Sequence, residues 1–148
     1  MISPEILRRY PYFAGIKDES LKAVAMISEE RSAAAGAVLF REDEPANHLF
    51  ILAEGEVDIR YAVGGGEHKS VDTLVGGDLM VWTAVVPPHK THSTAVARKD
   101  VRLVAIDAPK LRALCEQDPL LGFRLMSGIA EAVSHRLHGA GVQLAAMS

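Results

Sequence analysis

The chain has 148 residues, the size of one ordinary domain, which is long enough to enclose a single hydrophobic core. Hydrophobic residues make up 49% of the sequence and charged residues 24%, a balance that excludes a disordered or fibrous chain. The formal net charge of -3 at pH 7 disfavours nucleic acid as a default partner. We therefore expect one domain over residues 1–148.

Cysteine usage and the N-terminus bear on the cellular compartment. Cys115 is the only cysteine, so it cannot form an internal disulfide, which fits a reducing compartment. The first residues lack the basic start and apolar stretch of a signal peptide, and no later apolar run approaches the length needed to span a bilayer. We expect a cytoplasmic protein without a membrane segment.

Two short helices are expected in a lead-in over residues 1–30. Pro4 can sit in a first helical turn behind a Ser3 cap, and Pro11 stops this helix. Asp18 can cap a second helix, which ends at the charged stretch beginning at Glu29.

From residue 31 to residue 107, short β-branched and aromatic runs separated by turn residues predict a small all-β unit. Gly55 predicts a hairpin in which Asp58 and Arg60 face outward. The predicted strands are 37–41, 48–53, 56–62, 69–74, 93–98 and 101–106. They favour an antiparallel roll or sandwich.

Residues 108–148 are expected to be helical, with Pro109 opening one helix and Pro119 beginning another after an Asp118 cap. Gly139 and Gly141 weaken the end of the last helix. One apolar stripe runs along it at intervals of three and four, through Met126, Ile129, Val133, Leu137, Ala140 and Leu144.

The segment 47–59, NHLFILAEGEVDI, resembles the hairpin signature of the cyclic-nucleotide-binding domain family. Segments 7–16, 40–46 and 104–107 are also similar to motifs of that family, so the likeness covers almost the whole chain. It implies a mainly β fold with flanking helices, the Crp/Fnr-like β-roll, a double-stranded β-helix related to jelly rolls and cupins. It also implies a regulatory sensor that performs no catalysis.

In that family a phosphate-binding cassette holds the ligand. A glutamate accepts the ribose hydroxyl, while an arginine and the N–H groups at a helix start hold the cyclic phosphate. The cassette corresponds here to residues 77–93. Aligning Gly77 and Asp78 on the Gly-Asp before the cassette places Val81 and Trp82 where glycine and glutamate belong, and the arginine position falls at Thr91 or His92. Aligning one motif later lets Asp78 stand in for the glutamate, but the spacing to the arginine position is then too long.

The resemblance assigns ligand contacts to Gly77, Asp78, Val81, Trp82, Thr83, Thr91, His92 and Ser93. The implied ligand is cAMP, cGMP or another small anion, toward which a protonated His92 could lend charge. Loss of the arginine alone weakens binding by about ten- to a hundredfold. The alternative is a ligand-free scaffold for dimerisation and protein interaction, in which Trp82 fills the former pocket.

Other residues have plainer interpretations. His89 and His92 lack the carboxylate or cysteine partners of a metal site, so no metal is expected. Cys115 is interpreted as a small buried hydrophobe, and His135 as a solvated residue on a polar helix face.

The last helix points to a partner. The resemblance favours a homodimer through Met126, Ile129, Val133, Leu137 and Leu144. No helix-turn-helix follows this helix, so we expect no direct DNA binding.

Overall fold

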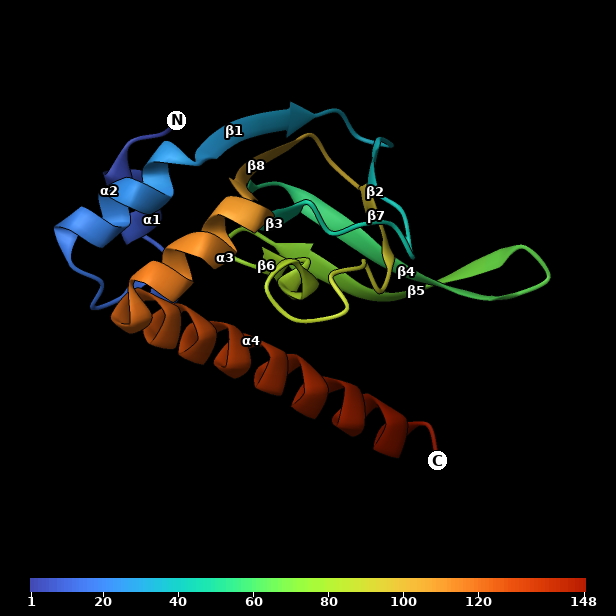
Figure 1. Cartoon of the computed structure of the whole chain (residues 1–148). Helices are drawn as coiled ribbons and strands as arrows, with labels where there is room; N and C mark the ends of the chain where they lie inside the picture. The colour runs from blue at the N-terminus through green and yellow to red at the C-terminus, as the bar shows by residue number, and fades with distance from the viewer.

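The computed structural model describes residues 1–148, and Figure 1 shows a β-roll with helices at both ends of the chain. The N-terminal helices are α1 (Pro4–Arg8), the 3-10 helix η1 (Pro11–Phe13) and α2 (Asp18–Met26). The strands are β1 (Ser28–Ala33), β2 (Val38–Phe40), β3 (His48–Glu54), β4 (Glu56–Gly64), β5 (Glu67–Val75), β6 (Leu79–Met80), β7 (Thr94–Ala97) and β8 (Val101–Asp107). A 3-10 helix, η2 (Trp82–Ala84), follows β6, and α3 (Ala108–Gln117) and α4 (Pro119–Ala146) end the chain.

The eight strands form two four-stranded antiparallel sheets. The first sheet has the order β1-β8-β3-β6, and the second has the order β2-β7-β4-β5. Phe50 of β3 stacks on Phe40 of β2 with ring centroids 6.1 Å apart, so this side of β3 faces the second sheet. Leu49 and Ile51 alternate to the opposite side and are buried too. This two-sided burial explains the continuous apolar run of β3.

The predicted β-roll is confirmed, and six of its strands lie close to the expected ranges. Two strands escaped prediction. Strand β1 carries the sequence SEERSA, in which only Ser28 is buried, so it has no hydrophobic alternation to reveal it. Strand β6 has only two residues. Because β1 pairs with β8 from Ser28 onward, the roll begins at residue 28 and not at residue 31.

Two local expectations were wrong. Asp18 is the first residue of α2 and does not cap it, because Lys17 holds the cap position and no side chain bonds there. Asp58 does not face outward but is buried, and its carboxylate bonds to Arg60 of its own strand and to Ser70 of the paired strand β5. Its Oδ2 accepts hydrogen bonds from Arg60 Nε at 2.7 Å and Ser70 Oγ at 2.8 Å.

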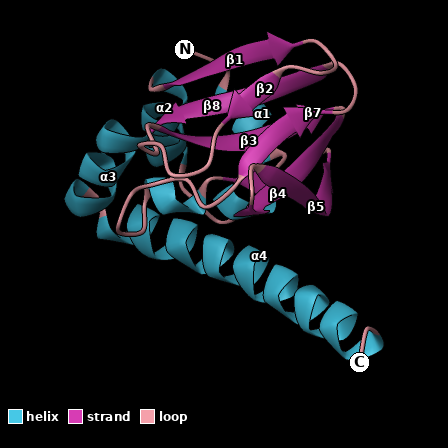
Figure 2. Cartoon of the chain, turned by 90° about the vertical axis from the view of Figure 1, so that its right-hand side faces the viewer, coloured by secondary structure: helices cyan, strands magenta, loops and turns pink.

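The buried residues of helix α4 all lie in its first half. Leu121, Leu125 and Ile129 are buried, but no later residue of the helix is. The helix continues unbroken through Gly139 and Gly141, and its C-terminal end extends beyond the sheets (Figure 2). None of the helices combines the length and apolar character that crossing a membrane requires.

Candidate functional site

The segment of residues 77–93, here called the cassette segment, leaves β6 through a sharp turn into η2. Val81, at the position of the family's glycine, has φ 62° and ψ 53°. This left-handed conformation costs a residue with a Cβ roughly 1–2 kcal/mol, whereas glycine adopts it freely. The backbone of this turn therefore has a conformation that glycine would adopt without strain.

Side chains from the helices hold the backbone carbonyls of this segment. Tyr12 of η1 donates its hydroxyl to the carbonyl of Gly77 at 2.9 Å, and Arg112 of α3 donates Nη1 to that of Ala84 at 2.6 Å. Arg136 of α4 donates Nη2 to the carbonyl of Leu79. The position of the cassette segment is therefore tied directly to the helices that flank the roll.

Thr91 has a structural role that occupies its hydroxyl. The side chain is buried, donates to the carbonyl of Arg41 and accepts from the backbone N–H of Glu44 at 2.9 Å. Its neighbour His92 is exposed. Of the two residues aligned with the missing arginine, only His92 is therefore free to approach a ligand.

Four further residues predicted to contact the ligand differ in how deeply they are buried. Val81 and Thr83 are buried, and the carbonyl of Thr83 accepts from His89 Nδ1 at 3.0 Å. Ser93 and Trp82 are half-buried. The indole ring of Trp82 lies under the guanidinium of Arg136, whose Cζ is 5.4 Å from the ring centroid. Trp82 thus faces α4.

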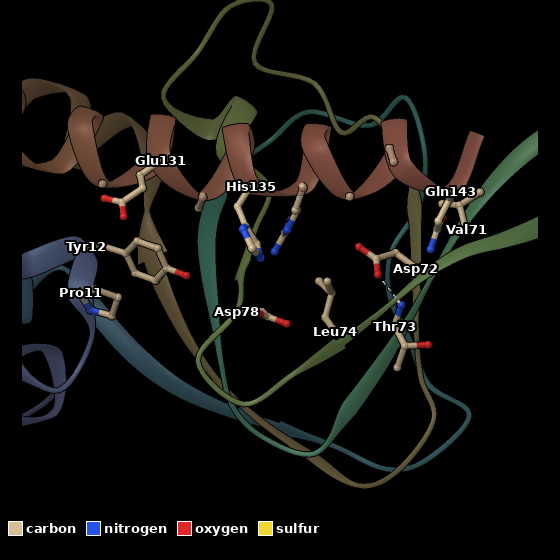
Figure 3. A pocket seen from close by; sticks show the side chains of 15 residues that line it. Pro11, Tyr12, Val71, Asp72, Thr73, Leu74, Asp78, Glu131, His135 and Gln143 are labelled. Atoms are coloured by element: carbon tan, nitrogen blue, oxygen red, sulfur yellow. Dashed lines mark hydrogen bonds between the residues drawn. The ribbon is translucent and has the colours of Figure 1, made fainter. Parts of the chain in front are cut away.

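A cavity of about 550 Å³ lies between β5, η1 and α4, next to the cassette segment (Figure 3). Of the eight predicted contact residues, only Asp78 lines it. Its other walls come from η1 (Pro11, Tyr12), β5 (Val71, Asp72, Thr73, Leu74) and α4 (Gly128, Glu131, Ala132, His135, Arg136, Gly139, Ala140, Gln143).

The α4 residues of the cavity were missed. His135 is exposed, as predicted, but it also lines this cavity, which was not predicted. A signal for them exists in the sequence. Gly128, Ala132, Arg136, Gly139 and Gln143 recur at intervals of three and four, which places them on one helix face. The residues of this second stripe are small or polar, so hydrophobic periodicity does not reveal them.

The cavity carries more acidic than basic groups. Asp72, Asp78 and Glu131 face the single guanidinium of Arg136. Burial raises the pKa of the Tyr12 phenol, and the Asp78 carboxylate raises it further. Tyr12 therefore stays a protonated donor to the Gly77 carbonyl across the neutral pH range.

The fold and the flanking helices define a regulatory domain of the Crp/Fnr-like β-roll class. A sequence profile described as the cyclic nucleotide-binding domain matches residues 30–118, which is more than half of the chain. The chain therefore belongs to the cyclic nucleotide-binding domain family, whose members are regulatory modules.

Among solved structures, a protein of Geobacter metallireducens assigned as cyclic nucleotide-binding superposes with a TM-score of 0.84 at 40% identity, covering 93% of this chain and 100% of that one. A CRP-like cAMP-activated global transcriptional regulator of Mycobacterium tuberculosis is 25% identical over 85% of this chain. A protein of Rhodopseudomonas palustris assigned as a potassium channel is 26% identical over 84% of it. This chain spans only 56% and 30% of the lengths of these two relatives.

Proposed function

We propose that the chain is a non-catalytic, cytoplasmic regulatory module that binds a small molecule in the cavity between β5, the cassette segment and α4. The observation that carries this proposal is the cavity itself. Its volume of about 550 Å³ falls in the range of ligand sites, roughly 300–1,000 Å³, and both the roll and α4 line it. A bound ligand would therefore contact both strand β5 of the roll and helix α4.

Cyclic AMP and cyclic GMP are the first ligands to test, because the family and the name of the mycobacterial relative point to them. The cassette segment argues for weak binding. Trp82 replaces the ribose-binding carboxylate, and the exposed His92 replaces the phosphate-binding guanidinium. We expect an affinity reduced by at least about ten- to a hundredfold relative to an intact cassette.

The second candidate function is a ligand-free scaffold. The contact between Trp82 and Arg136 favours it, because Arg136 covers the indole ring and Trp82 does not line the cavity. Either function can use a second copy of the chain as partner. Leu137 and Leu144 of α4 are 72% and 67% exposed, an apolar surface that pairing would cover. We propose that Met126, Val133, Leu137 and Leu144 of the predicted stripe form this contact, whereas Ile129 is already buried within the same chain.

A cavity-filling variant separates the two functions. Gly139 lines the cavity, and a Cβ there would meet nothing within 4 Å, so Gly139→Phe introduces a bulky side chain at the cavity wall. Gly141 has the same free surroundings on the same helix but does not line the cavity, so Gly141→Phe is the matched control.

The measurement is the unfolding temperature of each protein at increasing concentrations of cAMP, cGMP and a panel of positively and negatively charged small metabolites. A ligand of the native state raises this temperature saturably. We expect the shift in the wild type and in Gly141→Phe, and its loss in Gly139→Phe. If no compound stabilises the wild type, or if the shift survives in Gly139→Phe, the scaffold is the better account.

A further inference from the structure

Arg136 lines the cavity and covers Trp82, and its guanidinium shows what kind of group this indole ring accepts. It lies over the face of Trp82, with Cζ 5.4 Å from the ring centroid, and it donates a hydrogen bond to the carbonyl of Leu79. An aromatic face and a carbonyl oxygen both attract a planar cation that carries N–H donors. This subsite is therefore occupied by a cation that belongs to the protein.

The rest of the cavity has the same preference. Asp72 accepts a hydrogen bond from the N–H of Thr73 at 2.9 Å, and Asp78 accepts one from that of Val75 at 2.8 Å. These bonds engage only Oδ1 of Asp72 and Oδ2 of Asp78, and neither carboxylate forms an ion pair.

Glu131 adds a third carboxylate that forms no ion pair with any cation of the chain. Figure 3 shows Glu131 reaching from α4 toward Tyr12 across the cavity from Asp78.

These charges oppose the ligand that the family would suggest. A cyclic phosphate would bring a negative charge into a cavity with three unpaired carboxylates, while the one guanidinium is engaged by Trp82 and Leu79. A ligand cation meets the opposite situation, because it gains the carboxylates as partners and can replace Arg136 on the indole ring.

We propose that the cavity binds a small molecule with a planar, positively charged nitrogen group of the guanidinium or amidinium kind, which takes the place of Arg136 on Trp82. The inference rests on the proposed function, since it assumes that this cavity is the ligand site. Binding breaks the hydrogen bond from Arg136 to the carbonyl of Leu79. Helix α4 thereby loses this contact with β6 when the ligand is present.

Trp82 is the only tryptophan of the chain, so its fluorescence reports on this subsite alone. The probes are benzamidine, a planar amidinium, and benzamide, its neutral analogue of the same shape. We expect benzamidine to quench or shift the Trp82 emission saturably and benzamide to do so at least about tenfold more weakly.

Arg136→Ala removes the internal competitor, so it should bind benzamidine about tenfold more tightly than the wild type does. Arg124→Ala changes an exposed arginine of the same helix that does not line the cavity, and it should bind as the wild type does. Glu131→Gln, which keeps Arg136, guards against misfolding of Arg136→Ala, and it should weaken benzamidine binding by about threefold or more.

The outcomes separate this inference from the proposed function. Equal binding of benzamide and benzamidine, or no gain in Arg136→Ala, overturns the cationic ligand. Saturable binding of cAMP that Gly139→Phe abolishes, without any benzamidine binding, overturns the cationic ligand but leaves the cavity as the ligand site. If no probe binds the wild type or Arg136→Ala, both proposals are wrong.

Discussion

At the scale of single residues, His48 shows how a polar side chain is fixed at the start of β3. Its Nε2 accepts a hydrogen bond from Nη2 of Arg31 at 3.1 Å, and because arginine has no acceptor the imidazole must be neutral at this nitrogen. Burial lowers the pKa of His48 from its usual value of 6.5, and the nearby Arg31 charge lowers it further. Asp107 and Glu29 act weakly in the opposite direction.

A pH dependence of stability follows from this lowered pKa. Between the folded pKa and 6.5, the unfolded chain binds a proton that the folded chain does not, so the free energy of unfolding falls as the pH is lowered through this window. His48→Gln keeps an acceptor for Arg31 but cannot be protonated. Urea unfolding of both proteins at pH 7.5 and pH 5.5 should show a smaller loss in His48→Gln, and equal losses would contradict the assignment.

Residue identity alone predicts which cassette groups are missing, but it does not show what the residues present at these positions contact. The sequence shows that no arginine or glutamate stands at the aligned positions. It does not show that the hydroxyl of Thr91 bonds to the carbonyl of Arg41. Nor does it show that Arg136, far from Trp82 in the chain, lies over the indole ring. A contact at that separation exists only once α4 has packed on the roll.

At the scale of elements, the β3–β4 hairpin depends on Gly55. Its φ of +102° lies in the region that favours glycine, and a Cβ would come within 2.5 Å of the carbonyl oxygen of Asp100 and 2.7 Å of Val101 Cγ1. The turn therefore has two separate requirements, backbone freedom and space. Sequence patterning correctly predicted a glycine-dependent hairpin here, but the approach of the β7–β8 connection was not predictable.

Gly55→Ala should lower the free energy of unfolding by about 2–4 kcal/mol, because strain and overlap add. Gly64→Ala is the matched control, since Gly64 has a similar φ of +96° but nothing within 4 Å. It should cost only about 1–2 kcal/mol from backbone strain. Urea titrations of the three proteins provide the comparison, and a cost in Gly55→Ala no larger than that in Gly64→Ala would rule out the steric part.

Helix α4 carries two stripes of residues, and the sequence does not show which of them packs on the roll. The apolar stripe through Ile129 and Leu137 is visible from its spacing, yet only Ile129 is buried in the monomer. The stripe of small and polar residues through Gly128 and Arg136 forms a wall of the cavity. Periodicity identifies each face, but what covers a face depends on where the roll and a partner lie.

At the scale of the whole molecule, the projecting end of α4 is the clearest surface for a second copy (Figure 2). Leu137→Glu combined with Leu144→Glu places charges on the proposed contact and should convert a wild-type dimer into a monomer. His138→Glu adds a charge to another exposed face and should leave the dimer intact. Sedimentation equilibrium measures the masses, and a monomeric wild type or a dimeric double variant would refute the pairing.

The sequence by itself determined the β-roll, the flanking helices and the family, because alternation, glycine turns and helix caps are local and survive in the order of residues. It also predicts that the family's phosphate and ribose anchors are absent. Only the tertiary structure decided where the cavity lies, which carboxylates share it and that Arg136 lies on Trp82. These features join η1, β5, the cassette segment and α4, and no local pattern encodes the distances between elements so far apart in the chain.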